Sequence, residues 1–404
     1  MGIDKLLEIV ENICKIGKGK RDRHYIYDVG PFQHFFNESE KGKQIIYDQL
    51  DTKDGKFTRR EILARYLLLS SVLDQGPDIK GVELLLNNVI SELYKKEIRI
   101  LHRPLDFFKK LNIPINTILE EHEKVKNIRA EIWAKENNTR SSKYNLFFAQ
   151  SQRGIISIKQ VLDYSVHRWG VPLCALMLLE KDCNCSAQPF INYIENFDSA
   201  EKFTKKLKNH EKYGLGSAIG DKACHLFAKN YVSILNLRST KVKNDKRWSD
   251  ISYELPLDSN AGRVLFRVGF VKMLLEDDVL IRNNVIQKRK GKGETNYIRI
   301  TNLRDIKIEN CDLEKYKSCY SRMVKEHLII GSKEIIYFQR VPNLLIYLLS
   351  ECRKISYSIA DFDDGLIYIG TNFCFNHSEP KCDECDIKGI CAGKGTSIIK
   401  DYTT

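Results

Sequence analysis

The sequence predicts a mainly α-helical protein. Three observations predict this class: most segments carry apolar residues every three or four positions, strand-like alternation is scarce, and turn residues separate the helical stretches. RREILARYLLLSSVL (59–73) and GVELLLNNVISELYKK (81–96) both have the helical period, and the turn DQGPD (74–78) stands between them. Similar helical patterns occupy 115–135, 157–180, 221–235, 259–276 and 334–351. The best candidate for a strand is NYIRITNLRDIKI (296–308).

Three polar stretches indicate loops or insertions between these helices: KENNTRSSK (135–143), RSTKVKNDKRWSD (238–250) and QKRKGKGETN (287–296). The third is basic and contains glycine, so it is either a phosphate-contacting loop or a solvated surface loop. DCNC (182–185) has no convincing third ligand nearby and is expected to hold free thiols, with a second metal site as the alternative. Trp133, His167 and Trp169 are expected in the core or in a pocket wall.

Composition limits the class of protein. The chain has 404 residues, of which 43% are hydrophobic, so it is globular and long enough for two or three domains. Its net charge of +12 favours an anionic partner such as nucleic acid, and a lysine-rich but otherwise ordinary protein is the alternative. No apolar run suits a membrane span, and the N-terminus mixes acids into its apolar face. We therefore expect a cytoplasmic protein, without a nucleotide-binding loop that would indicate an ATP-driven nuclease or helicase.

Four cysteines lie close together in CFNHSEPKCDECDIKGIC (374–391), with seven, two and five residues between them. In a reducing compartment, clustered thiols indicate a soft metal or an iron–sulfur cluster. Structural zinc sites usually combine two short Cys pairs, whereas only Cys382 and Cys385 form a CxxC here. The spacing therefore favours a [4Fe–4S] cluster held by Cys374, Cys382, Cys385 and Cys391, with zinc or free thiols as alternatives.

This spacing resembles the C-terminal cluster loop of the endonuclease III family, the DNA glycosylases of the helix-hairpin-helix superfamily. The loop is one residue longer than usual between the first two cysteines. The stretch LGSAIGDKACHLFAKNYV (215–232) resembles the family's hairpin, although Ala218 stands where a glycine is usual. The resemblance implies that Ile219 and Gly220 place backbone N–H groups against a DNA phosphate. It also implies that Lys222 is the nucleophile of bifunctional members, and a surface lysine is the alternative.

Two further segments extend the resemblance. ELPLDSNAGRVLFRVGF (254–270) resembles the catalytic aspartate segment, which makes Asp258 the catalytic carboxylate and also a helix N-cap. The family often has His where this chain has Asn260. LLLSSVLDQGPD (67–78) resembles the helix end at which a glutamine, here Gln75, enters the DNA stack. Lys381 in the cysteine loop is expected to face phosphates. We expect Lys222 and Asp258 to converge on one sugar.

The resemblance covers about 60–97, 200–275 and 355–392. It implies two helical lobes of the helix-hairpin-helix type, a C-terminal [4Fe–4S] loop and atypical insertions. The expected segments are an N-terminal extension (1–56), a helical lobe with an insertion (57–199), the catalytic hairpin region (200–280), an unassigned helical and basic segment (281–354), and the cluster loop with its tail (355–404).

The implied function is a monomeric, nucleoid-associated DNA glycosylase that flips and excises a base from double-stranded DNA, with AP-lyase activity through Lys222. The base is either oxidised damage or, in a defence enzyme, a bulky modified base in foreign DNA. A non-catalytic DNA-binding protein that keeps the hairpin and the cluster is one alternative. A zinc-dependent binding module with an unrelated helical body is another.

Overall fold

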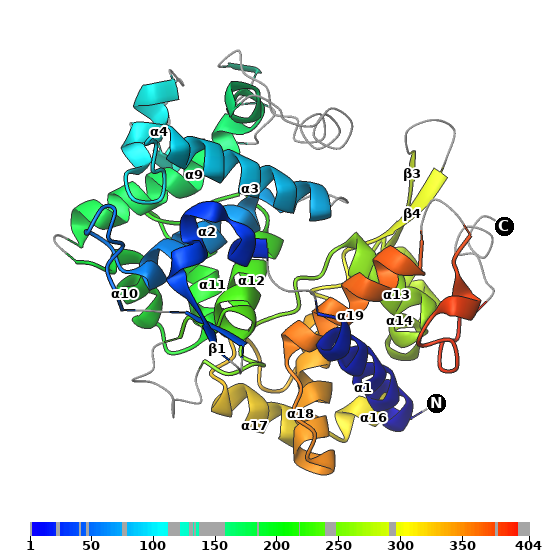
Figure 1. Ribbon diagram of the computed structural model, residues 1–404. Helices are drawn as coiled ribbons and strands as arrows, with labels where there is room; N and C mark the ends of the chain where they lie inside the picture. Colours follow the sequence, from blue (N-terminus) through cyan, green and yellow to red (C-terminus); the bar gives the residue numbers. More distant parts are fainter. Residues whose placement is uncertain are drawn as a thin grey trace. The chain divides into compact units, whose positions relative to one another are not determined.

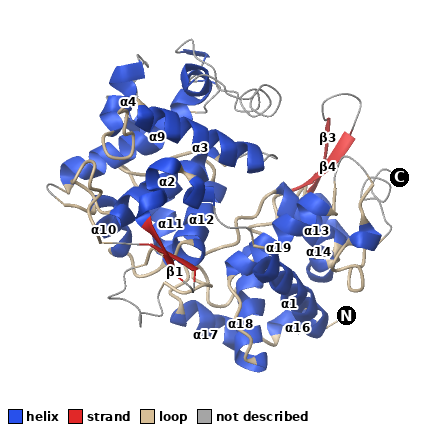
Figure 2. Cartoon of the chain, viewed as in Figure 1, coloured by secondary structure: helices blue, strands red, loops and turns tan. Residues whose placement is uncertain are grey.

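The structure is a computed structural model of the chain (Figure 1). It describes residues 2–21, 25–39, 42–45, 48–74, 79–111, 122–128, 132, 135–136, 158–183, 186–217, 219–238, 248–290, 296–375 and 379–394. The expected mainly α fold is confirmed, because strands in these ranges form only two antiparallel hairpins (Figure 2). The chain divides into two compact units: unit 1 is Met1–Asp22, Ser199–Glu201 and Asn244–Thr404, and unit 2 is Arg23–Asp198 and Lys202–Lys243.

Unit 1 consists of helices and one hairpin. Its elements are α1 (Ile3–Lys20), α13 (Ser259–Arg267), α14 (Phe270–Leu274), α15 (Asp277–Arg282), β3 (Ile286–Lys290), β4 (Asn296–Ile300), α16 (Cys311–Glu314), α17 (Lys317–Glu326), a 3₁₀ turn (Phe338–Arg340), α18 (Val341–Arg353), α19 (Ile359–Asn372) and a second 3₁₀ turn (Cys382–Glu384).

The first helix of the chain packs on the last long one. The apolar residues of α1 recur with the helical period, so Ile9, Val10 and Ile13 form one fully buried stripe. Gly17 of α1 and Gly365 of α19 meet so closely that a Cβ built on Gly17 would lie 2.6 Å from the backbone nitrogen of Gly365. The predicted segment 1–56 is therefore divided, with residues up to Asp22 belonging to unit 1.

Unit 2 is built around one buried helix. Its elements are two 3₁₀ turns (Tyr25–Asp28, Gly30–Phe35), β1 (Phe36–Ser39), β2 (Gly42–Ile45), α2 (Arg59–Leu73), α3 (Ile79–Lys95), α4 (Pro104–Leu111), α6 (His122–Val125), α9 (Ile158–Asp182), α10 (Pro189–Glu195), α11 (Ala200–Asn209), whose first two residues belong to unit 1, α12 (Asp221–Lys229) and a π-helical turn (Asn230–Ile234).

Every residue of α2 is buried, including its charged ones. Thr58 caps the helix by accepting a hydrogen bond from the backbone N–H of Glu61. Arg65 has no exposed side-chain surface and donates to Glu61 at 2.7 Å, so the two charges compensate each other inside the unit. The Glu61 carboxylate also accepts from the first backbone N–H groups of α10, at Phe190 (3.0 Å) and Ile191 (2.9 Å).

The predicted elements are reproduced to different extents. The helix expected over 59–73 is α2 with the same bounds, and those over 81–96 and 157–180 are α3 and α9. The helix expected over 259–276 is two helices, because Gly269 between them has a φ of 93°. The strand expected over 296–308 ends at Ile300. Of 115–135 only His122–Val125 and a few neighbours fall among the described residues.

Most of the predicted loops 135–143 and 238–250 lies outside the described residues. Trp169 is fully buried, as expected, whereas Trp133 and the side chain of His167 lie outside them. None of the described helices combines the length and the apolar character that a membrane span requires.

Candidate functional site

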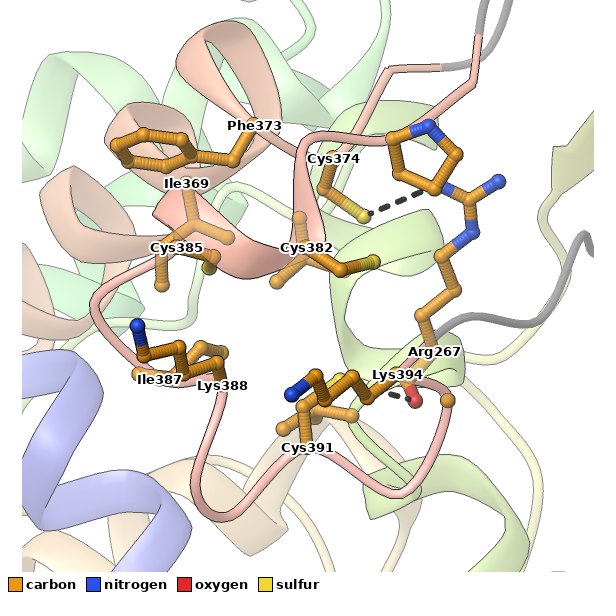
Figure 3. A pocket seen from close by; sticks show the side chains of 14 residues that line it. Arg267, Ile369, Phe373, Cys374, Cys382, Cys385, Ile387, Lys388, Cys391 and Lys394 are labelled. Carbon is orange, nitrogen blue, oxygen red and sulfur yellow. Dashed lines mark hydrogen bonds between the residues drawn. The ribbon is translucent and has the colours of Figure 1, made fainter.

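Unit 1 contains a pocket lined by all four cysteines of the C-terminal loop (Figure 3). The loop leaves α19 at Cys374, whose backbone N–H still bonds to Ile369 of the helix at 2.9 Å. Cys374 and Cys385 are buried, and Cys382 and Cys391 are partly exposed. The rest of the wall is mostly apolar and comes from α13, α19 and the loop itself: Val264, Val268, Ile369, Phe373 and Ile387. The cysteine spacing thus brings four thiols around one apolar hollow.

Two arginines of α13 fasten the cysteine loop to this helix. Arg263 donates from Nε to the backbone oxygen of Cys374 at 2.7 Å. Arg267 donates from Nη1 to the sulfur of Cys374 at 3.5 Å and to the backbone oxygen of Phe375 at 2.9 Å. In return, the Cys391 thiol donates to the backbone oxygen of Arg267 at 3.6 Å. The sequence interpretation did not include these arginines, although their i, i+4 spacing places them on one face of the helix.

The chemistry of the pocket fits a group that carries soft cations. Burial raises the pKa of the Cys385 and Cys391 thiols, and a coordinated metal is what deprotonates such thiols outright. Arg267 lines the pocket, and its buried Nε has no hydrogen-bond partner among the described residues, so it can donate to an acceptor placed there. Among the described side chains, no group of three His, Cys, Asp or Glu residues is arranged to hold a single metal ion.

Asp258 stands at the other end of α13 as its N-cap, as the sequence predicts. Its Oδ1 accepts hydrogen bonds from the backbone N–H groups of Asn260 and Ala261, both at 2.9 Å. The side chain is partly exposed. Both cap bonds use the same oxygen, so the cap occupies one of the two oxygens of the carboxylate. Asn260 is also the residue to which Arg263 donates, so the first turn of α13 is linked to the arginines that hold the cysteine loop.

The predicted hairpin is a turn between α11 and α12 in unit 2. Gly216 supplies the left-handed residue of this turn, with a φ of 62°. The side chain of Lys208, on α11, crosses the turn and donates from Nζ to the backbone oxygens of Gly216 (2.6 Å) and Ile219. Ile219 is fully buried, which anchors the end of the turn directly before α12. Ala218 lies outside the described residues.

Gly220 is the N-cap of α12 and provides no side chain to cap it. Its φ of −64° is one that any residue adopts, and a Cβ built on it would meet nothing within 4 Å. Neither backbone strain nor packing within the described residues therefore requires glycine at this exposed position. A glycine with open space in front of a helix N-terminus suits the close approach of a partner that carries an anion.

The other predicted site residues have different placements. Lys222 is half-buried in the first turn of α12 and belongs to unit 2, whereas Asp258 belongs to unit 1. Their convergence on one sugar stays a prediction. Lys381 is exposed, with its ammonium 3.6 Å from the carboxylate of Glu384. Gln75 lies outside the described residues, and so does Cys185 of the CxC pair, whereas Cys183 is partly exposed.

In comparisons with known proteins, no family model, no curated protein and no solved structure matches the chain.

Proposed function

We propose that this chain is a DNA N-glycosylase that carries a [4Fe–4S] cluster and excises a damaged or modified base from double-stranded DNA. The observation that carries the proposal is the double role of α13 in unit 1. The helix begins at the Asp258 carboxylate, and Val264 and Arg267 nearer its other end line the pocket of four cysteines. A group bound in that pocket would therefore stabilise the helix that presents the carboxylate.

Cys374, Cys382, Cys385 and Cys391 would hold the cluster. In a cubane each thiolate binds a different iron, and the pocket supplies one cysteine for each. The spacing favours the cubane over zinc, because only Cys382 and Cys385 form a short pair. Bound there, the cluster would cross-link the loop in a reducing compartment, where disulfides do not persist. Arg267 would donate to the Cys374 sulfur and so offset the negative charge that four thiolates bring.

DNA binding is proposed to begin at the turn before α12. The N-terminus of a helix carries partial positive charge and unpaired N–H groups, and these bind a phosphate without reading its sequence. The target nucleotide must leave the duplex before its glycosidic bond can be reached. We propose that Gln75 fills the space that the nucleotide vacates.

In the proposed chemistry, Asp258 stabilises the oxocarbenium-like sugar as the C1′–N bond breaks and its electron pair leaves with the base. The neutral amine of Lys222 forms a bond to C1′ and loses its proton. Opening of the sugar ring then gives a Schiff base. Loss of a proton from C2′ breaks the C3′–O bond and cleaves the strand. Without Lys222, water would attack C1′ and leave an abasic site.

A panel of duplexes, each with one oxidised, alkylated or bulky modified base, tests the glycosylase. Abasic sites should form on at least one of them. Asp258→Asn should slow this release by about a hundredfold or more, because it removes the negative charge. Asparagine is as good an N-cap as aspartate, so thermal stability should not change. Release from no duplex, or equal release by the variant, would contradict the proposal.

Borohydride trapping on the duplex from which a base is released tests the lyase step. The wild-type chain should form a covalent adduct with the DNA, and Lys222→Gln should not. Lys206→Gln is the matched control, because Lys206 is an exposed lysine of α11 outside the turn. Base release without any covalent adduct would contradict the AP-lyase activity and would still support the glycosylase activity.

The second candidate is a non-catalytic DNA-binding protein. The cap bonds of Asp258 favour it, because they give the residue a structural role that needs no chemistry. This candidate predicts DNA binding without base release from any duplex of the panel.

A further inference from the structure

The β3–β4 hairpin of unit 1 is a basic ribbon to which the proposed function gives no role. Ile286 pairs with Ile300 and Lys290 with Asn296, so ten residues form one regular antiparallel ladder. The two strands contain Lys288, Arg289, Lys290 and Arg299 and no acidic residue. The basic stretch expected to be a loop over 287–296 thus begins as a strand, and its tip at 291–295 lies outside the described residues.

The hairpin has one packed face and one exposed face. Ile298 and Ile300 are buried, and Arg299 between them points to the opposite face because side chains alternate along a strand. The register places Arg299 opposite Gln287 and Arg289 opposite Tyr297, so the two arginines are diagonal neighbours on that face. Diagonal neighbours are about 7 Å apart, close enough to act on one partner.

Arg289 and Arg299 are exposed, and neither forms an ion pair with an acid among the described residues. Arg289 donates to the amide oxygen of Gln287 at 2.7 Å. The cysteine loop is different. Its segment 379–394 contains three lysines and four acidic residues, and both Lys381 and Lys394 lie within 4.0 Å of an acid. The hairpin is therefore the better anion-binding surface of the two.

The hairpin is held directly on α13. A Cβ built on Gly262 of this helix would lie 3.0 Å from the backbone oxygen of Ile300 and 3.2 Å from its Cβ, so glycine allows the strand to pack against the helix. Gly262 lies one turn after Asp258. Figure 1 shows the ribbon of β3 and β4 extending away from α13 within this unit.

We propose that the β3–β4 hairpin is a DNA-binding arm, in which Arg289 and Arg299 grip phosphates beside the nucleotide that is excised. The inference rests on the proposed function, because it takes duplex DNA as the partner. A guanidinium donates two parallel hydrogen bonds to a phosphate, and a two-stranded ribbon follows a groove of the duplex. Because the arm is fixed to α13, its grip also sets the position of the Asp258 carboxylate against the DNA.

The salt dependence of DNA binding tests the arm. The probe is a labelled duplex with a tetrahydrofuran abasic-site analogue, and the measured quantity is the slope of log K against log salt concentration. Arg289→Gln combined with Arg299→Gln should reduce the slope by about 2, since each lost phosphate contact removes about 0.9. The control combines Lys315→Gln with Lys325→Gln, exposed lysines at and near α17, which Figure 1 shows well away from the hairpin. It removes the same charge and should leave the slope unchanged.

A conservative variant separates charge from geometry. Arg289→Lys with Arg299→Lys should keep the slope and weaken binding by a few fold, since lysine keeps the charge and loses the planar fork. If the double Gln variant kept the wild-type salt slope, or if the lysine control lost as much slope, the hairpin would not be a DNA-binding arm. The proposed glycosylase activity would not be affected by that result. If the wild type released no base at all, the proposed function would fail. The salt slopes measured on the abasic-site analogue would still show whether the hairpin binds DNA.

Discussion

The starts of two helices in this chain differ in how their backbone N–H groups are satisfied. In unit 1, α13 begins at Asp258, whose carboxylate accepts two of these N–H groups, and Gly262 and Arg263 pack the first turn against β4 and the cysteine loop. In unit 2, α12 begins at Gly220, which has no side chain to offer and open space in front of it.

The comparison distinguishes two roles of a helix N-terminus, which are to stabilise its own unit and to bind an anionic partner. A capped and packed start stabilises its own unit and leaves fewer donors for a ligand. A start with glycine gives up roughly 0.5 kcal/mol or less of capping energy and places no side-chain acceptor against the first N–H groups of the helix. We therefore expect the loss of the α13 cap or of the contacts that hold this helix to lower stability, and charge changes at the start of α12 to affect DNA binding.

The largest effect on stability is expected from the cysteine loop that packs against α13. Cys385→Ser removes one of the four thiols, so the proposed cluster should be lost and the protein should lose its brown colour. The melting temperature should fall by roughly 8 to 16 °C, which corresponds to the loss of a structural metal group in a unit of this size. Cys352→Ser, at an exposed cysteine outside the loop, is the control and should change neither quantity. Equal effects of the two would contradict a special role for the loop.

A smaller effect is expected at one link between α13 and the loop. Arg267→Gln removes the positive charge beside the Cys374 sulfur and keeps a polar side chain. Visible absorbance should bleach about tenfold faster under a chelator, because groups that support metal ligands typically contribute this much to affinity. Arg282→Gln, at an exposed arginine of α15, should bleach at the wild-type rate. Unchanged bleaching of the Arg267 variant would show that this hydrogen bond does not support the ligand.

Removal of the N-cap of α13 should lower stability less than loss of a cysteine of the loop does. Asp258→Ala loses both cap bonds, which are worth about 1 kcal/mol together, so the melting temperature should fall by roughly 2 to 4 °C. Asp258→Asn keeps the acceptor and should melt with the wild type. The pair distinguishes capping from charge, and a fall in both variants would mean that the carboxylate has a further structural partner.

The smallest effect on stability is expected at α12, with opposite signs for folding and binding. Gly220→Asp and Gly220→Asn both add a cap and should raise stability by about 0.5 kcal/mol. Only the aspartate places a negative charge against the proposed phosphate, so it should weaken duplex binding by about fivefold more than the asparagine does. Equal binding by the two variants would argue against an anion at this helix start.

The sequence was most informative where one pattern was strong. The bounds of α2 follow from its period and from Thr58 at its start, and both are local signals. The pattern over 334–351 suggested too early a start, because α18 begins at Val341 with Pro342 in its first turn, a start signal that outweighs the apolar residues before it. β3 was not predicted, because QKRK has no apolar alternation and becomes a strand only by pairing with β4.

The candidate site could be predicted only in part, for a related reason. Capping by Asp258 depends on its nearest neighbours, and the closeness of the four cysteines on one loop depends on their spacing, so both can be derived from a short window. The bonds of Arg263 and Arg267 to residues 374 and 375 span more than 100 positions and depend on the packing of α13 against α19. Nothing in the local sequence of either helix contains this contact.

The close crossing of α1 and α19 has a consequence for synthesis on the ribosome. The first helix emerges early, but its partner surface around Gly365 is made more than 340 residues later. At roughly 5 to 20 residues per second, this delay is on the order of tens of seconds. During that time the apolar face of α1 has no partner helix and is exposed to solvent, although the intervening unit has already left the exit tunnel. Nascent chains of this protein should therefore depend on a chaperone that covers the apolar face of α1 until α19 has been made.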